Sequence, residues 1–254
     1  MDYKIKGKRA LVIGASKGLG AASAKLLAEE GVEVFAAARN IDKINDWAKD
    51  LSVSSYQLDL TNSKSVSDLE KIILEEGFDI LVNNCGGPPA GSARDQSSES
   101  WQSAFNSMAL PMYQFTNAAI PKMIEKKWGR IISIGSSGIE QPIPNLVLSN
   151  GVRGAIAGWS KTLAAEVAQY GITVNMVLPG RISTDRLREL DEGKANRTGL
   201  SYKQVVSDAF NTIPAKRYGE PDEFAAVVTF LASELASYVT GSMIRVDGGV
   251  TMGL

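Results

Sequence analysis

Short apolar runs alternate along the chain with longer segments of helical periodicity. The apolar run Ala10–Ile13 is followed by a helical pattern over Leu19–Glu30, which Gly31 ends. Further strands are predicted at Glu33–Ala38, Val53–Leu58, Ile80–Val82, Ile131–Ile134, Thr173–Leu178 and Met243–Val246. Strands that alternate with helices favour a parallel sheet covered on both faces. The pattern predicts one doubly wound α/β domain of the Rossmann type over residues 1–254, with a parallel sheet of about seven strands.

Two segments interrupt this regular alternation. A loop rich in Gly, Pro and Ser runs from Asn84 to Ser97, and a long helical stretch follows to about Lys127, with interruptions expected near Pro111 and Pro121. The chain is polar from Ser183 to Leu200, which indicates either an ordinary surface loop or a mobile lid. Long loops in compact domains are often functional, so we favour a substrate lid over residues 183–211.

Composition excludes several classes of protein. The chain has 27 Lys and Arg against 28 Asp and Glu, so it lacks the basic excess that nucleic-acid and membrane surfaces usually need. No apolar run has the roughly 18 residues of a membrane helix, and the polar N-terminus carries no signal segment. The single Cys85 fits a reducing compartment, and we expect a cytoplasmic protein.

The chain contains no histidine. Ser-His-Asp and Cys-His nucleophilic sites, helical His-Glu-x-x-His zinc sites and imidazole bases are therefore excluded. We expect no metal, and any chemistry must come from hydroxyls, carboxylates, amines or a cofactor.

A glycine pattern follows the first predicted strand directly. Gly14, Gly18 and Gly20 lie between that strand and the next helix, with Ser16, Lys17 and Leu19 among them. In the first turn of a βα unit such glycines let the backbone approach a pyrophosphate, whose charge the helix N-terminus stabilises. A plain tight turn would have the same composition, but the position favours a dinucleotide site.

The second strand ends in Ala38-Arg39, where a site for NAD usually has an acid. Arg39 and Lys17 place two cations near one ribose, which suits a 2′-phosphate. Either residue alone could be a solvated surface charge. Together they favour NADP(H), with NAD(H) remaining open.

The next two strands also end in candidate cofactor residues. Asp59-Leu60 follows the third strand, and the Asp59 carboxylate could accept a hydrogen bond from the adenine amino group. Asn84-Cys85-Gly86 follows the fourth strand. Small residues there let the backbone pass close to a ligand in the crevice at the carboxyl ends of the strands.

With these residues the chain resembles the short-chain dehydrogenase/reductase family over nearly its whole length, and within it the branch of 3-oxoacyl-carrier-protein-reductase-like proteins. The further matching motifs are Ser136, Asn175, Pro179-Gly180, Tyr238-Val239-Thr240-Gly241 and Val246-Asp247-Gly248-Gly249. The resemblance implies that Pro179, Gly180, Ile182 and Thr184 border the nicotinamide of the cofactor.

The catalytic positions of that family are largely replaced. The family uses Asn, Ser, Tyr and Lys, and these positions correspond here to Met108, Ser136, Ser149 and Arg153. Only Ser136 is retained, which indicates a divergent subgroup without the usual tetrad. A Ser149 hydroxyl is far less acidic than a Tyr hydroxyl, and Arg153 stays charged. Arg153 could still hold a ribose hydroxyl or an anionic substrate.

Other proton donors are open. A protonated Glu140, four residues after Ser136, or the hydroxyl of Tyr202 could reach a substrate, although we favour a solvated loop acid and a half-buried packing residue as their explanations. We expect an NADP(H)-dependent oxidoreductase that interconverts a carbonyl and an alcohol on a small molecule. The alternative is a catalytically weak or inactive dinucleotide-binding protein that acts as a sensor or interaction subunit.

The resemblance also implies a homo-oligomer, a tetramer or a dimer. Val250, Met252 and Leu254 near the C-terminus offer apolar side chains for a symmetric contact. No nucleic-acid or membrane partner is expected.

Overall fold

Seven parallel strands form one sheet in the computed structural model, which describes residues 2–253. The strands are β1 (Arg9–Ile13), β2 (Glu33–Ala38), β3 (Val53–Gln57), β4 (Ile80–Asn83), β5 (Gly129–Ile134), β6 (Ile172–Pro179) and β7 (Met243–Val246). Their order in the sheet is β3-β2-β1-β4-β5-β6-β7. The order reverses between β1 and β4, so a crevice opens at the carboxyl ends of these two strands. The predicted doubly wound sheet is confirmed.

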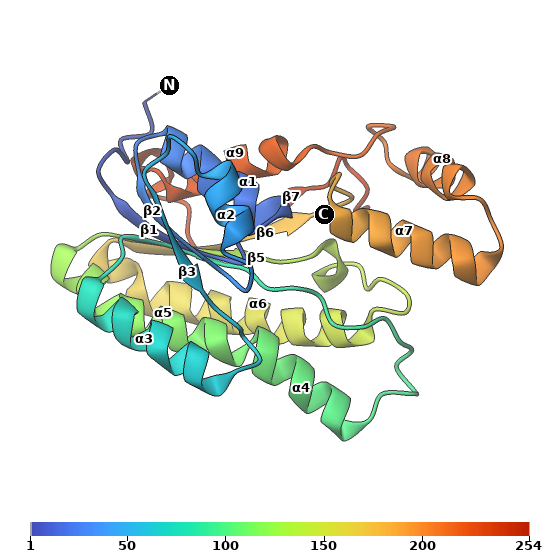
Figure 1. Ribbon diagram of the computed structural model, residues 1–254, viewed down its shortest axis with the longest axis horizontal. Helices are drawn as coiled ribbons and strands as arrows, with labels where there is room; N and C mark the ends of the chain where they lie inside the picture. The colour runs from blue at the N-terminus through green and yellow to red at the C-terminus, as the bar shows by residue number, and fades with distance from the viewer. Residues whose placement is uncertain (1, 254) are drawn as a thin grey trace.

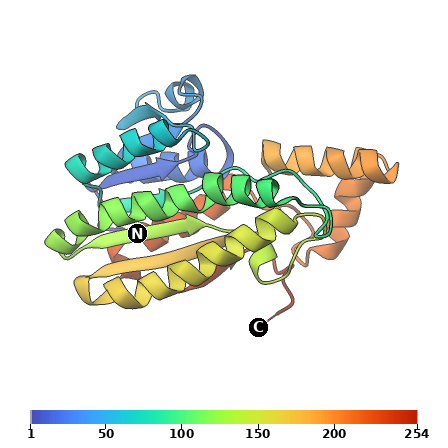
Figure 2. The ribbon, with the colours of Figure 1, turned by 90° about the horizontal axis from the view of Figure 1, so that it is seen from below.

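Helices cover both faces of this sheet. They are α1 (Gly18–Glu29), α2 (Asp42–Trp47), α3 (Ser63–Glu76), α4 (Ser98–Met108), α5 (Leu110–Lys126), α6 (Val147–Val167), α7 (Asp185–Thr198), α8 (Tyr202–Thr212) and α9 (Pro221–Ala232). Helices α1 and α9 pack together on one face, and α3, α5 and α6 lie on the other (Figure 1). Helices α7 and α8 form an arm that projects beyond the carboxyl end of the sheet (Figure 2). Within residues 2–253, no helix combines the length and the apolar character needed to cross a membrane.

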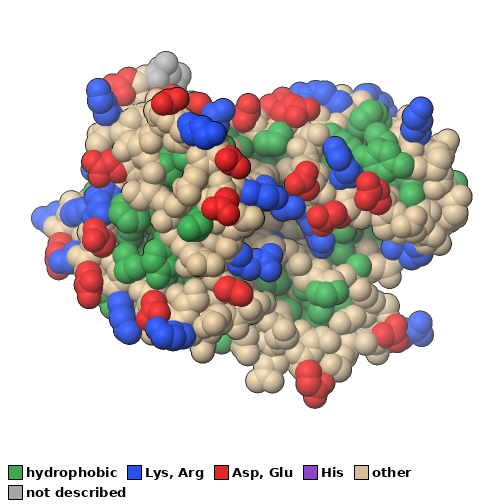
Figure 3. Space-filling view, in the orientation of Figure 1, with side chains coloured by type: hydrophobic (Ala, Val, Ile, Leu, Met, Phe, Trp, Pro, Cys, Tyr) green, Lys and Arg blue, Asp and Glu red, His purple; other side chains and the backbone are tan. Residues whose placement is uncertain are grey.

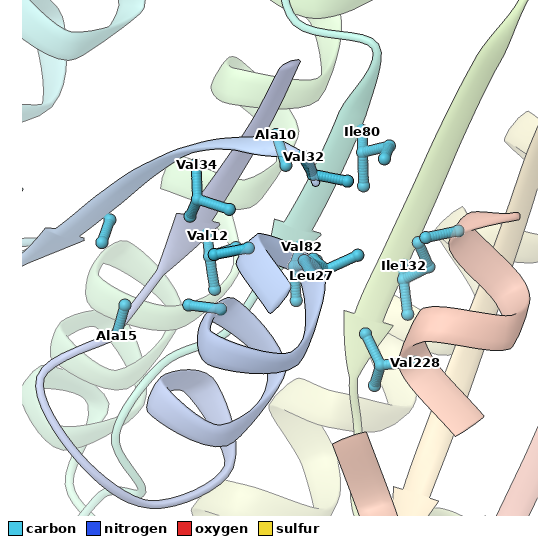
Figure 4. Close-up of a cluster of buried hydrophobic side chains, with 14 of the residues drawn as sticks. Ala10, Val12, Ala15, Leu27, Val32, Val34, Ile80, Val82, Ile132 and Val228 are labelled. Atoms are coloured by element: carbon cyan, nitrogen blue, oxygen red, sulfur yellow. The ribbon is translucent and has the colours of Figure 1, made fainter. Parts of the chain in front are cut away.

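The sheet core follows from the apolar runs of the central strands. All four residues of β4 and all six of β5 are buried, as expected for strands covered on both faces. Val12 of β1, Leu27 of α1 and Val228 of α9 meet in one cluster between the sheet and its first helical layer (Figure 4). Each such side chain stabilises the fold by about 1.5–3 kcal/mol through burial.

The long helical stretch before β5 breaks only once. Helices α4 and α5 are separated at Ala109, and Pro111 occupies the first turn of α5, where its missing N–H costs nothing. The expected interruption at Pro121 is wrong, because α5 continues through this residue to Lys126. Its neighbours Ala119 and Met123 are fully buried against the sheet, and this packing offsets the lost hydrogen bond.

The polar segment 183–200 is not a loop. Helix α7 begins at the Thr184 cap, whose hydroxyl accepts a hydrogen bond from Leu187 N at 3.3 Å, and ends at Gly199, where φ is +72°. The apolar periodicity that marks helices is missing because only Asp191 and Ala195 are buried in α7. The loop interpretation is therefore wrong, while a lid over residues 183–211 stays a prediction that a helical arm is able to fulfil.

Candidate functional site

The glycine turn between β1 and α1 is shaped by close contacts with the end of β4. Gly14 and Gly18 have φ values of +68° and +60°, which side chains rarely adopt. A β-carbon on Gly20 would lie 2.8 Å from Asn84 Nδ2, and one on Gly14 would lie 2.7 Å from the same atom. The Asn84 amide donates to Gly14 O at 3.4 Å. The turn therefore needs glycine at Gly14 and Gly20, and Asn84 lies beside it.

The start of α1 is open to an anion. Lys17 is the N-cap residue, and no side chain caps the helix. Backbone N–H groups of the first turn, which includes Gly18, Leu19 and Gly20, have no partner within the helix and carry the positive end of its dipole. An uncapped helix start beside a glycine turn fits a pyrophosphate, so the residues present fit the dinucleotide that the sequence predicts.

Two exposed cations lie in this turn and after the neighbouring strand β2. Arg39 is exposed after the buried Ala38 at the end of β2, and Lys17 is exposed in the turn. Figure 3 shows Lys and Arg side chains around a hollow near the middle of this face, between the sheet and the α7–α8 arm. Ser16 is half-buried next to Lys17. The arrangement can hold a phosphate in addition to the pyrophosphate.

The Asp59 carboxylate after β3 is oriented by its own turn. Its Oδ1 accepts hydrogen bonds from Thr61 N at 2.9 Å and Thr61 Oγ1 at 2.7 Å. These bonds, with a smaller contribution from the charge of Arg39, hold the pKa of Asp59 below its usual range. The neighbouring Leu60 packs against the apolar layer under the sheet. Asp59 is thus an ionised acceptor at the edge of the crevice.

Arg153 turns into the protein rather than toward solvent. Its Nη1 donates to Ile134 O at 2.8 Å and its Nη2 to Cys85 O at 3.4 Å, so the guanidinium lies at the carboxyl ends of β5 and β4. The residue is 8% exposed, and within residues 2–253 no carboxylate lies within ion-pair distance of it. A buried cation therefore lies at the crevice without a neutralising charge.

The Cys85 thiol lies beside this guanidinium. Burial raises the pKa of Cys85, and the charge of Arg153 offsets only part of that rise. Gly86, which follows, is exposed and leaves the backbone open toward the crevice. Cys85 is thus a neutral packing residue whose carbonyl, rather than thiol, serves the site.

Ser136 and Ser149 lie on the segments that flank the crevice after β5. Ser136 begins the short 3-10 turn Ser137–Ile139, and its Oγ accepts from Gly138 N at 3.1 Å. Ser149 is half-buried in the first turn of α6, one turn before Arg153. The sequence pattern predicts a helix over Val152–Gln169, but the helix begins five residues earlier, at Val147. Ser149 is therefore helical and lies four positions before Arg153 on the same face.

Asn150 is a residue beside the candidate site whose structural role sequence reasoning missed. Its Nδ2 donates to Ile143 O at 2.9 Å, and its Oδ1 accepts from Ile143 N at 3.4 Å. A β-carbon on Gly138 would clash with Asn150 Oδ1 and lie 3.2 Å from Ser136 Oγ, so these two side chains meet over Gly138. Asn150 thus holds the loop from Ser136 to Leu146 against α6. A polar residue next to a proposed catalytic position was the only available signal.

Met108 is the residue that the family resemblance predicts in place of an asparagine. It is 2% exposed and packs in an apolar cluster with Cys85, Leu148 and Val152. No polar atom from this position can reach the crevice.

The segment after β6 forms the opposite wall. A β-carbon on Gly180 would lie 2.6 Å from Asp247 Cα, so the strand end and the turn after β7 pass in contact. Ile182 is buried and pairs with Gly219 as an isolated bridge. Thr184 Cγ2 lies 3.6 Å from where a Gly18 β-carbon would stand. Pro179, Gly180, Ile182 and Thr184 therefore lead from β6 to a point facing the glycine turn.

A polar network at the base of α7 was not predicted. Arg181 Nη1 donates to Asp191 Oδ1 at 2.6 Å, and Tyr218 Oη donates to Asp191 Oδ2 at 2.7 Å. Asp191 is 1% exposed. Burial, and then the bond to Asp191, raises the pKa of Tyr218 to about 12. The network joins α7 to the wall after β6 and to the loop before α9.

The two alternative proton donors lie in other environments. Glu140 forms an ion pair with Arg245 of β7, which also donates to Gly253 O at 2.6 Å. The ion pair therefore holds the Glu140 side chain against β7. Tyr202 is 41% exposed at the start of α8, on the arm.

The apolar contact that the sequence predicts at the C-terminus includes Val250 and the exposed Met252, while Leu254 lies outside the described residues.

Comparisons with known proteins cover almost the whole chain. The family model described as enoyl-(acyl carrier protein) reductase matches residues 14–251. The 3-oxoacyl-[acyl-carrier-protein] reductase of Escherichia coli is 36% identical over 254 residues, which cover 97% of this chain and 98% of the relative. The chain belongs to the short-chain dehydrogenase/reductase family. The reductase of the same name from Vibrio cholerae is 34% identical over 98% of this chain and 99% of its own.

Solved structures of this family share the fold. L-sorbose reductase from Gluconobacter frateurii, complexed with NADPH and L-sorbose, has a TM-score of 0.92 and 30% identity, with full coverage of both chains. An NADPH-dependent reductase involved in bacilysin biosynthesis has a TM-score of 0.92 and 28% identity, over 98% of this chain and 100% of its own. The chain is thus an oxidoreductase of the short-chain type.

Proposed function

We propose that this protein is an NADP(H)-dependent reductase that interconverts a carbonyl and an alcohol on a small substrate, with a substituted catalytic tetrad. The observation that carries the cofactor assignment is the uncapped start of α1 beside the glycine turn, with Lys17 and Arg39 next to it and no acid at Ala38. The NADPH named with the solved relatives supports the same choice.

Each cofactor residue has a role in this proposal. The turn from Gly14 to Gly20 holds the pyrophosphate, and Asp59 accepts from the adenine amino group. Lys17 and Arg39 bind the 2′-phosphate, and NADP(H) supplies the hydride. The residues that border the nicotinamide are Asn84, Cys85, Gly86, Pro179, Gly180, Ile182 and Thr184.

The catalytic residues proposed are Ser136, Ser149 and Arg153. The Ser136 and Ser149 hydroxyls donate to the substrate carbonyl and polarise it, while Arg153 fixes the ends of β4 and β5 and holds a ribose hydroxyl. A buried guanidinium stays charged, so it cannot pass on a proton as a lysine can. Proton transfer to the substrate is therefore the step that limits the rate of reduction in this proposal.

The names of the relatives suggest the class of substrate. The Escherichia coli and Vibrio cholerae proteins are 3-oxoacyl-[acyl-carrier-protein] reductases, so a 3-oxoacyl thioester is the first substrate to test. The loop from Asn84 to Ser97, the segment Ser136–Leu146 held by Asn150, and the arm of α7 and α8 would set the specificity.

The test compares NADPH binding with NADPH oxidation over a panel of 3-oxoacyl thioesters and small ketones. The Ser149→Tyr and Arg153→Lys double variant provides a tunable proton donor and its cation, so it should reduce ketones at least about tenfold faster than the wild type. Each single change should do little. NADPH binding without turnover in the wild type and in the double variant would contradict the catalytic proposal and favour a sensor or interaction subunit.

A further inference from the structure

The first two turns of α7 connect the two walls of the cofactor crevice through charged contacts. Lys17 Nζ lies 3.3 Å from Asp185 Oδ2 and 3.8 Å from Glu189 Oε1. Glu189 Oε2 lies 3.5 Å from Arg186 Nη1, and Arg186 Nη2 donates to Pro88 O at 3.4 Å. Helix α7 therefore contacts the glycine turn on one side and the loop after β4 on the other.

The two acids form one binding surface for Lys17. Asp185 and Glu189 are four residues apart and share one face of α7. Both carboxylates are about as exposed as Lys17, at 61%, 55% and 50% of their side chains. Exposed ion pairs are weak, so an anion with more acceptor oxygens can displace them.

Lys17 is also one of the two cations assigned to the 2′-phosphate in the proposed function. A phosphate at this ammonium would come close to the Asp185 and Glu189 carboxylates, and like charges at that range repel. The ion pairs between Lys17 and α7 and the binding of a phosphate to Lys17 are therefore in part mutually exclusive.

We propose that Asp185 and Glu189 are specificity-determining residues that compete with the 2′-phosphate of NADP(H) for Lys17, and that phosphate binding releases the start of α7 from the glycine turn. This inference rests on the proposed use of NADP(H). Thermodynamic linkage makes the two effects equal in free energy. The binding free energy that the 2′-phosphate loses because of Asp185 and Glu189 is the same as the free energy by which the bound phosphate weakens the contact between Lys17 and α7. NADH lacks the phosphate and leaves the contact in place.

The test measures binding of NADPH, NADH and adenosine 2′,5′-bisphosphate to the wild type and to Asp185→Asn and Glu189→Gln. Each substitution should tighten NADPH and the bisphosphate about two- to fivefold and leave NADH unchanged, as expected from the strength of exposed ion pairs. Glu192→Gln is the matched control, because it removes the same charge from an exposed position of α7. In a Lys17→Met background the gain should disappear.

A second readout follows the helix itself. Adenosine 2′,5′-bisphosphate, which has no nicotinamide to order the arm, should speed hydrogen exchange of the first α7 amides about two- to fivefold, and 5′-ADP should not. Equal changes for NADPH and NADH, no change in either, or the same gain in Glu192→Gln would overturn the inference. Wild-type preference for NADH would contradict the proposed cofactor instead, and the bisphosphate would then decide the competition by itself.

Discussion

Replacing Arg181 with methionine should loosen α7 without unfolding the protein. Methionine keeps an apolar stem but removes the cation that pairs with the buried Asp191 carboxylate at 2.6 Å. Breaking a fully buried pair costs about 3–5 kcal/mol. Because the Arg181 side chain is 31% exposed, water screens part of this loss, and we expect about 2 kcal/mol.

The loss of stability in Arg181→Met should be confined to α7. Helix α7 buries only Asp191 and Ala195, so it has little apolar packing that would couple it to the sheet. A loss of about 2 kcal/mol corresponds to about thirtyfold faster hydrogen exchange in α7. Exchange mass spectrometry of peptides from 185–198 measures it, with Arg188→Met, at an exposed position of the same helix, as the control.

The same network gives an optical readout. Burial, and then the Asp191 carboxylate, raises the pKa of Tyr218 to about 12. Asp191→Asn replaces this charged acceptor with a neutral amide, so the pKa of Tyr218 should fall toward 10. The raised pKa stabilises the folded state fully below pH 10, and this contribution is lost as the pH rises toward 12. Unchanged α7 exchange in Arg181→Met, or equal exchange in Arg188→Met, would refute the reasoning.

Three further predictions concern the cofactor, the acid limit and assembly. Arg39→Ala should weaken NADPH binding about ten- to hundredfold and NADH binding far less, measured by titration; an equal loss for both would contradict a phosphate role. The hydrogen bond from Arg217, and to a smaller extent the one from Glu220 N, lowers the pKa of Glu223 to about 2. The resulting stabilisation of the folded state is present above pH 4.5 and is lost as the pH falls toward 2. In Glu223→Gln, the melting temperature should therefore depend less on pH between 4.5 and 2. Sedimentation at micromolar concentration should give a dimer or tetramer, and a lone 27.2 kDa species would refute this.

The sheet could be predicted because its strands carry their own signal. Apolar runs such as Ile80–Val82 and Ile131–Ile134 are buried on both faces, so the sequence pattern and the burial coincide. The observed ends of helices differ from the predicted ones where a helix end depends on contacts with neighbouring segments. Helix α6 begins at Val147, because Asn150 and the loop ending at Leu146 fold onto its first turn.

Helix α7 could not be predicted for a different reason. Its sequence has no apolar face. Contacts with residues far along the chain hold the helix in place, such as those of Asp191 with Tyr218 and of Asp185 with Lys17. Local periodicity contains no information on such pairs. The direction of Arg153 was hidden in the same way, since its acceptors are backbone carbonyls that every residue possesses.

This difference explains why the cofactor side of the crevice is easier to assign than the substrate side. The turn from Gly14 to Gly20 is a local motif whose glycines are required by positive φ values and by close contacts within the turn and with Asn84. The substrate side is assembled from the loop held by Asn150 and from α7, which Arg181 and Asp191 hold in place. Each of these contacts joins separate segments, so a change at one of them alters the pocket without altering any motif. The substrate side of this fold can therefore change while the glycine turn stays the same.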